Sequence, residues 1–395
     1  MKSIAERYVR LVLALGLHDK HYVDAYYGPE EWRPTATLSL AQIREEACSA
    51  VKELETVQPA VEHEALRKQF LATQLEALAF RARMLDGEKV SFDEECRSLY
   101  GVEAPIHPDS YYDAVISELE GLLPGTGDLS ERYERFCAPF RIPAERLARV
   151  FDAAIQEARN RTRQHIALPD DENFRIEYVR GEVWGAYNWY QGASQSLIQV
   201  NTDFPMSIGQ PLHLACHEGY PGHHVYNLLL EQKLMSGQGW MEFSVYPLFS
   251  PESLIAEGTA EYAVEMLFTA EERLEFEKSV IYPLASLDPS QADEFGQVRE
   301  VVEKLRYTSV DGARRYLDGE ASKEETISWL VKYGPSTPER AEQRLRFFEA
   351  NRSYVATYEV GQDLVRDCVE KSGPDRWKTF ERILSTPQVP SNLTK

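Results

Sequence analysis

The chain has 395 residues and a formal net charge of −21 at pH 7, from 64 acidic and 43 basic side chains. This length is sufficient to bury a large core, as one domain or as two closely packed ones. The excess of acidic side chains argues against binding to nucleic acid, whose phosphates require a basic protein surface, and against binding to an anionic membrane surface.

The five cysteines are scattered along the chain and show no CxxC spacing. They therefore indicate neither a disulfide framework nor a thiolate zinc site, and reduced thiols are expected. The first apolar run, residues 11–17, is short and follows charged residues, which is more typical of an amphipathic helix than of a signal peptide. Since no stretch approaches the roughly 20 apolar residues of a membrane span, we expect a soluble, cytoplasmic protein.

The N-terminal part of the chain is predicted to be helical. Apolar residues recur there at three- and four-residue spacing, which is the period of a helix, over residues 3–18, 39–57, 60–86, 111–122 and 143–166. The polar segment 169–173 interrupts this pattern. We therefore expect a helical N-terminal half, residues 1–168, and a catalytic half, residues 169–395, unless the two form one continuous domain.

A small sheet is predicted at the start of the second half. Residues 174–179 and 196–201 alternate between apolar and polar, as strands do. We expect the second strand to lie at the edge of the sheet, where its unpaired backbone groups could bind an extended peptide. The alternative is a sheet that only covers the helices.

The segment His217-Glu218-Gly-Tyr-Pro-Gly-His223-His224 contains the residue types of a hydrolytic zinc site. Neutral imidazoles hold the metal in such sites, and an adjacent carboxylate handles the proton of the reacting water. In the usual HExxH helix the two ligands lie one turn apart, but Pro221 occupies the position of the second histidine here.

The wider spacing requires an irregular backbone. In a regular helix His223 would lie roughly 9 Å along the axis from His217 and on another face. Pro221 and the glycines on either side of it make a regular helix unfavourable, and a bulge or wide turn would bring the two rings together. We predict His217 and His223 as the metal ligands, with His224 pointing outward or supporting a ligand.

A third ligand is expected from the helix that follows. Glu257 and Glu261 lie four residues apart and so share one face. We predict that Glu257 binds the metal and that Glu261 accepts a hydrogen bond from the far nitrogen of a ligating histidine; the alternative is that both are solvated. His213 lies four residues before His217, which is the spacing of the two ligands in HExxH. However, Leu214 occupies the position of the glutamate base in that pattern, so we expect His213 to be a buried histidine that does not bind the metal.

Helices are predicted to resume over residues 252–276, 289–318, 322–333, 337–350 and 354–371. A peptidase that cleaves at a free C-terminus also needs a cation to bind the substrate carboxylate. The candidates are Arg314, Arg315 and Arg352, although surface ion pairing explains any one of them better.

The motif 217–224, followed by a helix containing Glu257-Gly-Thr-Ala-Glu-Tyr262, resembles the signature of the domain-of-unknown-function 885 family. In that family a HExxPGHH segment precedes an EGWA-type helix, so Thr259 departs from the usual tryptophan. Segments 91–96, 197–201 and 358–361 also look like family segments. The similarity therefore covers about residues 60–370, with the region 351–358 shortened.

The family's fold is similar to Taq-type carboxypeptidases and to other mainly helical gluzincins. The resemblance implies a mainly α, elongated, multi-helix zincin-like metallopeptidase with a small β-sheet beside the metal-site helix, and it places strand 197–201 next to the metal. It also favours Tyr358, with Tyr354 as the alternative, as the hydroxyl that faces the negative charge of the transition state.

These observations predict a zinc-dependent hydrolase with one Zn²⁺ ion held by His217, His223 and Glu257. Glu218 would act as the general base on the water activated by the metal. The expected substrate is a peptide or a small amide, cleaved by a carboxypeptidase or an oligopeptidase. The alternatives are a metal-dependent hydrolase of other amides or esters and a helical protein that binds metal without catalysis. Histidine and carboxylate ligands also accept several other divalent ions.

Overall fold

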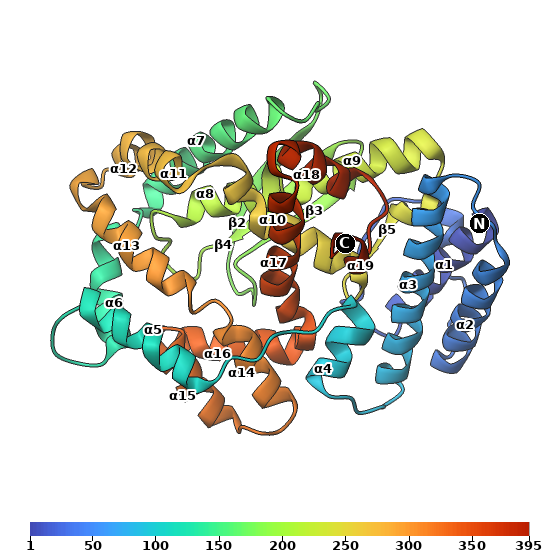
Figure 1. Ribbon diagram of the computed structural model, residues 1–395, viewed down its shortest axis with the longest axis horizontal. Coiled ribbons are helices and arrows are strands. Elements are labelled where there is room, and N and C mark those ends of the chain that lie inside the picture. Colours follow the sequence, from blue (N-terminus) through green and yellow to red (C-terminus); the bar gives the residue numbers. More distant parts are fainter. Residues whose placement is uncertain (395) are drawn as a thin grey trace.

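The structure, a computed structural model, describes residues 1–394. It is mainly helical with two small sheets, so the predicted mainly α fold is confirmed. The molecule is elongated in the view of Figure 1, with helices α10 (Pro251–Leu267) and α17 (Ala356–Lys371) near its middle.

The N-terminal helices lie at one end of the molecule and along its rim (Figure 1). They are α1 (Lys2–Gly16), α2 (Leu40–Thr56), α3 (Glu62–Leu85), α4 (Phe92–Glu95), α5 (Asp109–Leu122), α6 (Leu129–Cys137) and α7 (Ala144–Arg163). Local sequence signals define some of the ends. Ser39 and Gln42 form a capping box that satisfies free backbone donors at the start of α2.

The larger sheet corrects one prediction. Its strands are β2 (Asn173–Val179), β3 (Ala186–Gly192) and β4 (Gln195–Asn201), in the order β2-β4-β3. The predicted edge strand 196–201 is therefore central, parallel to β2 and antiparallel to β3. The sequence did not reveal β3 because its turn uses Ala193 and Ser194, both at positive φ, instead of the Asn-Gly pair typical of such hairpins.

A second, two-stranded sheet joins distant parts of the chain. Strand β1 (Val23–Tyr26) pairs with β5 (Val245–Pro247) in the antiparallel sense. Nearby, the Arg67 guanidinium donates two hydrogen bonds, of 2.5 and 2.9 Å, to the buried Glu242 carboxylate. A single cluster of buried apolar side chains includes residues from Ile4 to Leu393. Of the N-terminal helices, α7 packs directly on α8 (Gln210–Leu214) and the turn after it, which carry His213 and His217, and α3 contacts α10.

The remaining helices follow the sheet. They are α8 (Gln210–Leu214), α9 (His223–Leu229), α11 (Ala270–Phe276), α12 (Tyr282–Ala285), α13 (Ala292–Glu303), α14 (Thr308–Leu317), α15 (Lys323–Tyr333), α16 (Pro338–Asn351), α18 (Arg376–Ser385) and α19 (Pro390–Leu393).

Two helices predicted as continuous, 252–276 and 289–318, are each divided in the structure. The first is interrupted at Phe268 and Thr269, because Thr269 forms a capping box with Glu272 and starts α11. The second is interrupted between Glu303 and Thr308, where the apolar period continues although the backbone turns.

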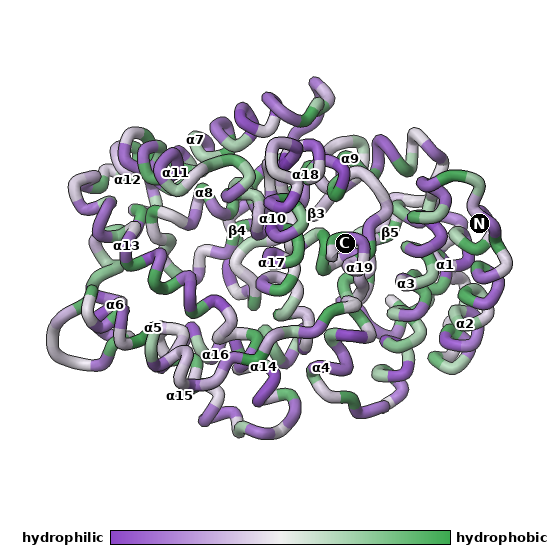
Figure 2. The backbone as a smooth tube through the Cα atoms, in the orientation of Figure 1, coloured by the Kyte–Doolittle hydropathy of each residue, from purple (hydrophilic) through white to green (hydrophobic). Residues whose placement is uncertain are grey.

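Hydrophilic and hydrophobic residues are interspersed along the outer helices (Figure 2). Among residues 1–394, none of the helices combines the length and the apolar character needed to cross a membrane.

Candidate metal centre

The histidine-bearing segment is not a regular helix. It passes from α8 into a π-helical turn, Ala215–Gly219, and then through Tyr220 and Pro221 into α9. The amide of Tyr220 donates to the carbonyl of Ala215, and that of Gly222 donates to the carbonyl of Cys216, both at 3.0 Å. These hydrogen bonds span five and six residues, so the backbone makes the wide turn that the motif requires.

Gly222 makes this turn possible. A Cβ atom at this position would lie 1.8 Å from the carbonyl oxygen of His217 and 2.4 Å from that of Cys216. Only a residue without a side chain can approach the preceding turn this closely. As a result, the ring centroids of His217 and His223 lie 4.8 Å apart, with the rings nearly perpendicular.

Glu257 on α10 completes the predicted ligand set. Its two carboxylate oxygens lie 3.4 Å from Nε2 of His217 and 3.5 Å from Nε2 of His223. The three ligand atoms all fall within 4.8 Å of one another. Two ligands bound at about 2.0–2.2 Å to one tetrahedral zinc ion lie about 3.4 Å apart, whereas charged hydrogen bonds measure about 2.7–2.9 Å. The observed spacing therefore fits metal ligands better than hydrogen bonds.

The electrostatics of these side chains also favour a cation. Oε2 of Glu257 is buried and has no hydrogen-bond partner among the described residues. Burial raises the pKa of Glu257, but His223 and His217 outweigh that effect and hold it below its usual value. Burial lowers the pKa of His217, but Glu257 and Glu261 raise it well above the usual value. The site stabilises positive charge, and two imidazoles and one carboxylate are side chains of the types that bind zinc.

Two glycines bring the tyrosine-bearing segment next to Glu257. A Cβ on Gly258 of α10 would lie 2.3 Å from the carbonyl oxygen of Gly361 on α17, so the helices touch backbone to backbone. At this crossing the hydroxyl of Tyr354 donates a 2.6 Å hydrogen bond to Oε1 of Glu257. Tyr354 thus orients the carboxylate.

Glu218, the predicted base, lies beside the ligands. Its Oε1 is 4.0 Å from Nε2 of His217, and its side chain is only 6% exposed. Burial raises the pKa of Glu218, an effect that His217 and His223 oppose. The side-chain amide of Asn188 on β3 donates a 2.6 Å hydrogen bond to the backbone carbonyl of Glu218. The sheet is therefore attached to the metal-site segment through β3.

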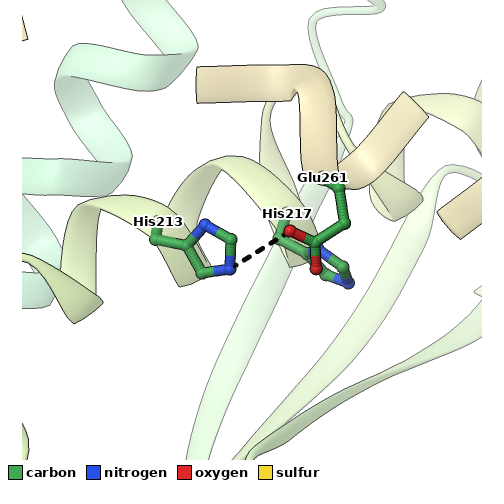
Figure 3. Close-up of side chains that lie close together, drawn as sticks. All are labelled: His213, His217 and Glu261. Atoms are coloured by element: carbon green, nitrogen blue, oxygen red, sulfur yellow. Dashed lines mark ion pairs between the residues drawn. The ribbon is translucent and has the colours of Figure 1, made fainter. Parts of the chain in front are cut away.

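Glu261 lies on the far side of His217, where the helical spacing placed it. One of its oxygens is 3.3 Å from Nδ1 of His217, and the other is 3.8 Å from Nε2 of His213. Figure 3 shows this arrangement, with His213 and His217 on one helical stretch and Glu261 approaching from α10. His213 was expected to be buried, but its side chain is 37% exposed because it points into the space in front of Glu261.

His224 has a different role from the two predictions made for it. It is fully buried, with Nδ1 2.8 Å from Oγ of Ser196 on β4 and Nε2 3.1 Å from Glu172. Glu172 also accepts hydrogen bonds from Tyr220 and Arg159. Burial would raise the pKa of Glu172, but these partners lower it to about 2. His224 therefore neither points outward nor supports a ligand, because its neighbours anchor the turn to the sheet.

Tyr358 lies next to the candidate centre with a free hydroxyl. Its ring is 6.4 Å from that of His217 and nearly parallel to it. In the described part of the chain its hydroxyl forms no side-chain hydrogen bond, unlike that of Tyr354. Burial raises the pKa of Tyr358 well above its usual value, and the negative charges of Glu257 and Glu261 raise it further. The hydroxyl is thus a protonated donor.

The three predicted arginine clamps lie elsewhere, because acidic partners hold each of them. Arg314 pairs with Asp93 and Asp311, Arg315 with Asp109, and Arg352 with Glu95. Each is therefore engaged in ion pairs, as the alternative explanation proposed, although the pair of Arg314 with Asp311 is buried and does not lie at the surface.

The arginine that lies near the site is Arg344 on α16. It forms no ion pair within residues 1–394, and its only side-chain hydrogen bond is to Ser309. Its side chain is exposed, yet desolvation lowers its pKa, and the charges of Glu359 and Tyr358 act on it. No sequence pattern marked Arg344 among the other arginines of its helix.

Asp24 is a second residue that the sequence did not indicate. It lies on β1, far from the motif in sequence, and accepts a hydrogen bond from Tyr187 of β3. Burial raises the pKa of Asp24 to about 7, and His223, Glu257 and Glu218 are the charges that act on it. The strand is too short, at four residues, to show a periodic pattern.

Comparisons with known proteins add information about the fold. No protein-family model and no curated protein match the chain. The similar solved structures include two described as putative lipoproteins. One is from Colwellia psychrerythraea, with a TM-score of 0.53 and 15% identity, over 92% of this chain and 69% of that one. The other is from Shewanella oneidensis, with a TM-score of 0.51 and 14% identity, over 90% of this chain and 71% of that one. The second is described as being of unknown function. At these identities the similarity concerns the fold alone.

Proposed function

We propose that the protein is a zinc-dependent hydrolase of peptide bonds, in line with the resemblance of its motif to the domain-of-unknown-function 885 family. The observation that supports this most directly is the convergence of Nε2 of His217, Nε2 of His223 and the Glu257 carboxylate, with Glu218 beside them. These three residues would hold the ion. When bound, zinc lowers the pKa of a water molecule and polarises a carbonyl group.

Glu218 would move the proton in this reaction. Its carboxylate would accept a proton from the attacking water and later deliver it to the leaving amine. Burial raises its pKa above that of an ordinary carboxyl group, which makes its carboxylate a stronger base. The hydrogen bond from Asn188 fixes the backbone from which Glu218 projects.

Tyr358 would stabilise the oxygen on which negative charge develops. A donor aimed at that oxygen acts mainly in the transition state, and its hydroxyl is free to do so. Tyr354 would keep Glu257 in its ligand orientation instead.

The substrate would lie along β3. Because β4 is central, the unpaired edge of the sheet nearest Glu218 belongs to β3, which pairs only with β4. An extended peptide can add to such an edge through backbone hydrogen bonds. Arg344 would then bind a carboxylate of the peptide, which favours a carboxypeptidase among the peptidase types considered.

The first test is a peptide-library digest with and without a zinc chelator. We expect chelator-sensitive cleavage, with residues removed one at a time from the C-terminus. Cleavage restricted to non-peptide amides would support the broader amide hydrolase instead. A protein that binds zinc but cleaves nothing would be a metal-binding protein without catalysis.

Two substitutions test the assigned roles. Glu218→Gln should keep the zinc and lose nearly all turnover, whereas His217→Ala should lose the zinc itself. Elemental analysis and digestion assays measure both quantities, with the exposed Glu271→Gln as the matched control. An active, zinc-loaded Glu218→Gln protein would exclude Glu218 as the base, and stoichiometric zinc in His217→Ala would contradict the ligand set.

A further inference from the structure

Within residues 1–394, two groups of side chains have the spacing to hold a metal ion, and they share His217. The first is the centre described above. The second consists of His213, Glu261 and the opposite ring nitrogen of His217, Nδ1. In Figure 3 the imidazole of His213 points towards the Glu261 carboxylate, which lies against His217.

The distances in this second group are not those expected if Glu261 only held the His217 ring in place through a hydrogen bond. Nδ1 of His217 is buried and has no hydrogen-bond partner in the described part of the chain, although an oxygen of Glu261 lies 3.3 Å away. The other oxygen is 3.8 Å from Nε2 of His213, beyond hydrogen-bond range. A histidine supported only by a carboxylate would donate at about 2.7–2.9 Å. Both separations are closer to the roughly 3.4 Å between two ligands of one tetrahedral cation.

The second group is also more open to water than the first. Apart from the shared His217, the side chains of the second group, His213 and Glu261, are 37% and 21% exposed, compared with 13% and 7% for His223 and Glu257 of the first. A cation there would keep water in its remaining positions and bind more weakly. Imidazole and carboxylate ligands suit zinc and neighbouring transition metals rather than calcium or magnesium.

We propose that His213 and Glu261, with Nδ1 of His217, form a second divalent transition-metal site beside the first. The incoming cation would displace the Nδ1 proton to solvent, and the His217 ring would then bridge two ions. Glu261 would at the same time bind the second ion, and it would then no longer be free to accept a hydrogen bond from Nδ1 of His217. Excess zinc would therefore lower the turnover of the hydrolase. This last consequence rests on the proposed function, whereas the site itself does not.

The test is a zinc titration of the metal-free, full-length protein against a chromophoric chelator. Elemental analysis after gel filtration gives the bound stoichiometry. Wild type should bind two equivalents, the second at least tenfold more weakly and with release of a proton, measured by calorimetry in buffers of different ionisation enthalpy. His213→Ala should bind one equivalent, while the exposed-histidine control His63→Ala should bind two.

The outcomes separate this proposal from the proposed function. Wild-type protein that stops at one equivalent, or His213→Ala that still binds two, would overturn the second site. If His213→Ala does not fold, as judged by circular dichroism, His213→Gln gives the same comparison. Two equivalents bound without any peptide hydrolysis would support the site and reject the hydrolase. If hydrolysis occurs, excess zinc should inhibit wild type and His63→Ala but not His213→Ala.

Discussion

Two tyrosines about one helical turn apart, Tyr354 and Tyr358, have different environments although both lie at the candidate centre. The Tyr354 hydroxyl is bound to a carboxylate oxygen of Glu257, whereas that of Tyr358 has no side-chain partner among the described residues. The sequence favoured Tyr358 for the transition-state role, with Tyr354 as the alternative, but it assigned no separate role to Tyr354. The distinction depends on how α17 is rotated against α10, which no sequence spacing reveals.

Changing each tyrosine to phenylalanine should therefore affect a different property, either zinc affinity or kcat. Tyr354→Phe should weaken zinc binding about 10–100-fold, because a metal ligand loses its orienting hydrogen bond. Tyr358→Phe should leave zinc binding unchanged and lower kcat about 10²–10³-fold, as loss of a transition-state donor does. Chelator competition and steady-state kinetics on both proteins measure these effects. If Tyr358→Phe lost zinc and kept kcat, the two roles would have to be exchanged.

At the scale of elements, the sequence predicted the helices far better than the site geometry. Helical periodicity located α1, α2, α3 and α7 because each carries apolar residues at helical spacing over many residues. Helices α2 and α7 bury one face, whereas α1 and α3 are buried nearly all round in their second halves. It did not locate β1 or β3, because a short strand and a turn without Asn-Gly leave no such pattern. The motif's glycines and proline indicated an irregular backbone, and the structure brings His217 and His223 together there through a π-helical turn.

The close contact between Gly258 on α10 and Gly361 on α17 offers a test at the scale of elements. Gly258→Ala would place a methyl group against the backbone of Gly361, which must then move away. We expect the variant to lose about 2–3 kcal/mol of unfolding free energy and to bind zinc more weakly, since Glu257 is adjacent. Gly121→Ala, in α5 with no neighbouring atom, should instead be neutral or stabilising by up to about 1 kcal/mol. Similar denaturation midpoints for the two variants would contradict this account of the crossing.

At the scale of the whole molecule, stability depends on a buried carboxyl group away from the candidate centre. Glu252, at the start of α10, is 3% exposed, and its Oε2 has no hydrogen-bond partner. Burial raises its pKa to about 8. The folded protein therefore keeps this proton at neutral pH, while the unfolded chain releases it above its usual pKa of about 4.3. The stabilising effect of the protonated form is complete at acid pH and is lost as the pH rises to 8.

Glu252→Gln should remove this pH dependence. Relative to the variant, wild type should lose stability progressively between about pH 5 and pH 8, by a few kcal/mol in total, since one unit of pKa shift is worth about 1.4 kcal/mol. Urea denaturation of both proteins at several pH values provides the measurement. Parallel stability curves over this range would show that the Glu252 carboxyl group has an ordinary pKa.

The pairing of β1 with β5 and the buried Arg67–Glu242 pair have a practical consequence for any attempt to dissect the molecule. A fragment beginning at residue 169 would expose the surfaces that α1 and α3 cover, and it would lack Asp24. Expressed alone, it should aggregate. A single backbone nick in the exposed loop 124–128 should be harmless by comparison, because the two pieces would remain associated through these contacts and copurify as one particle.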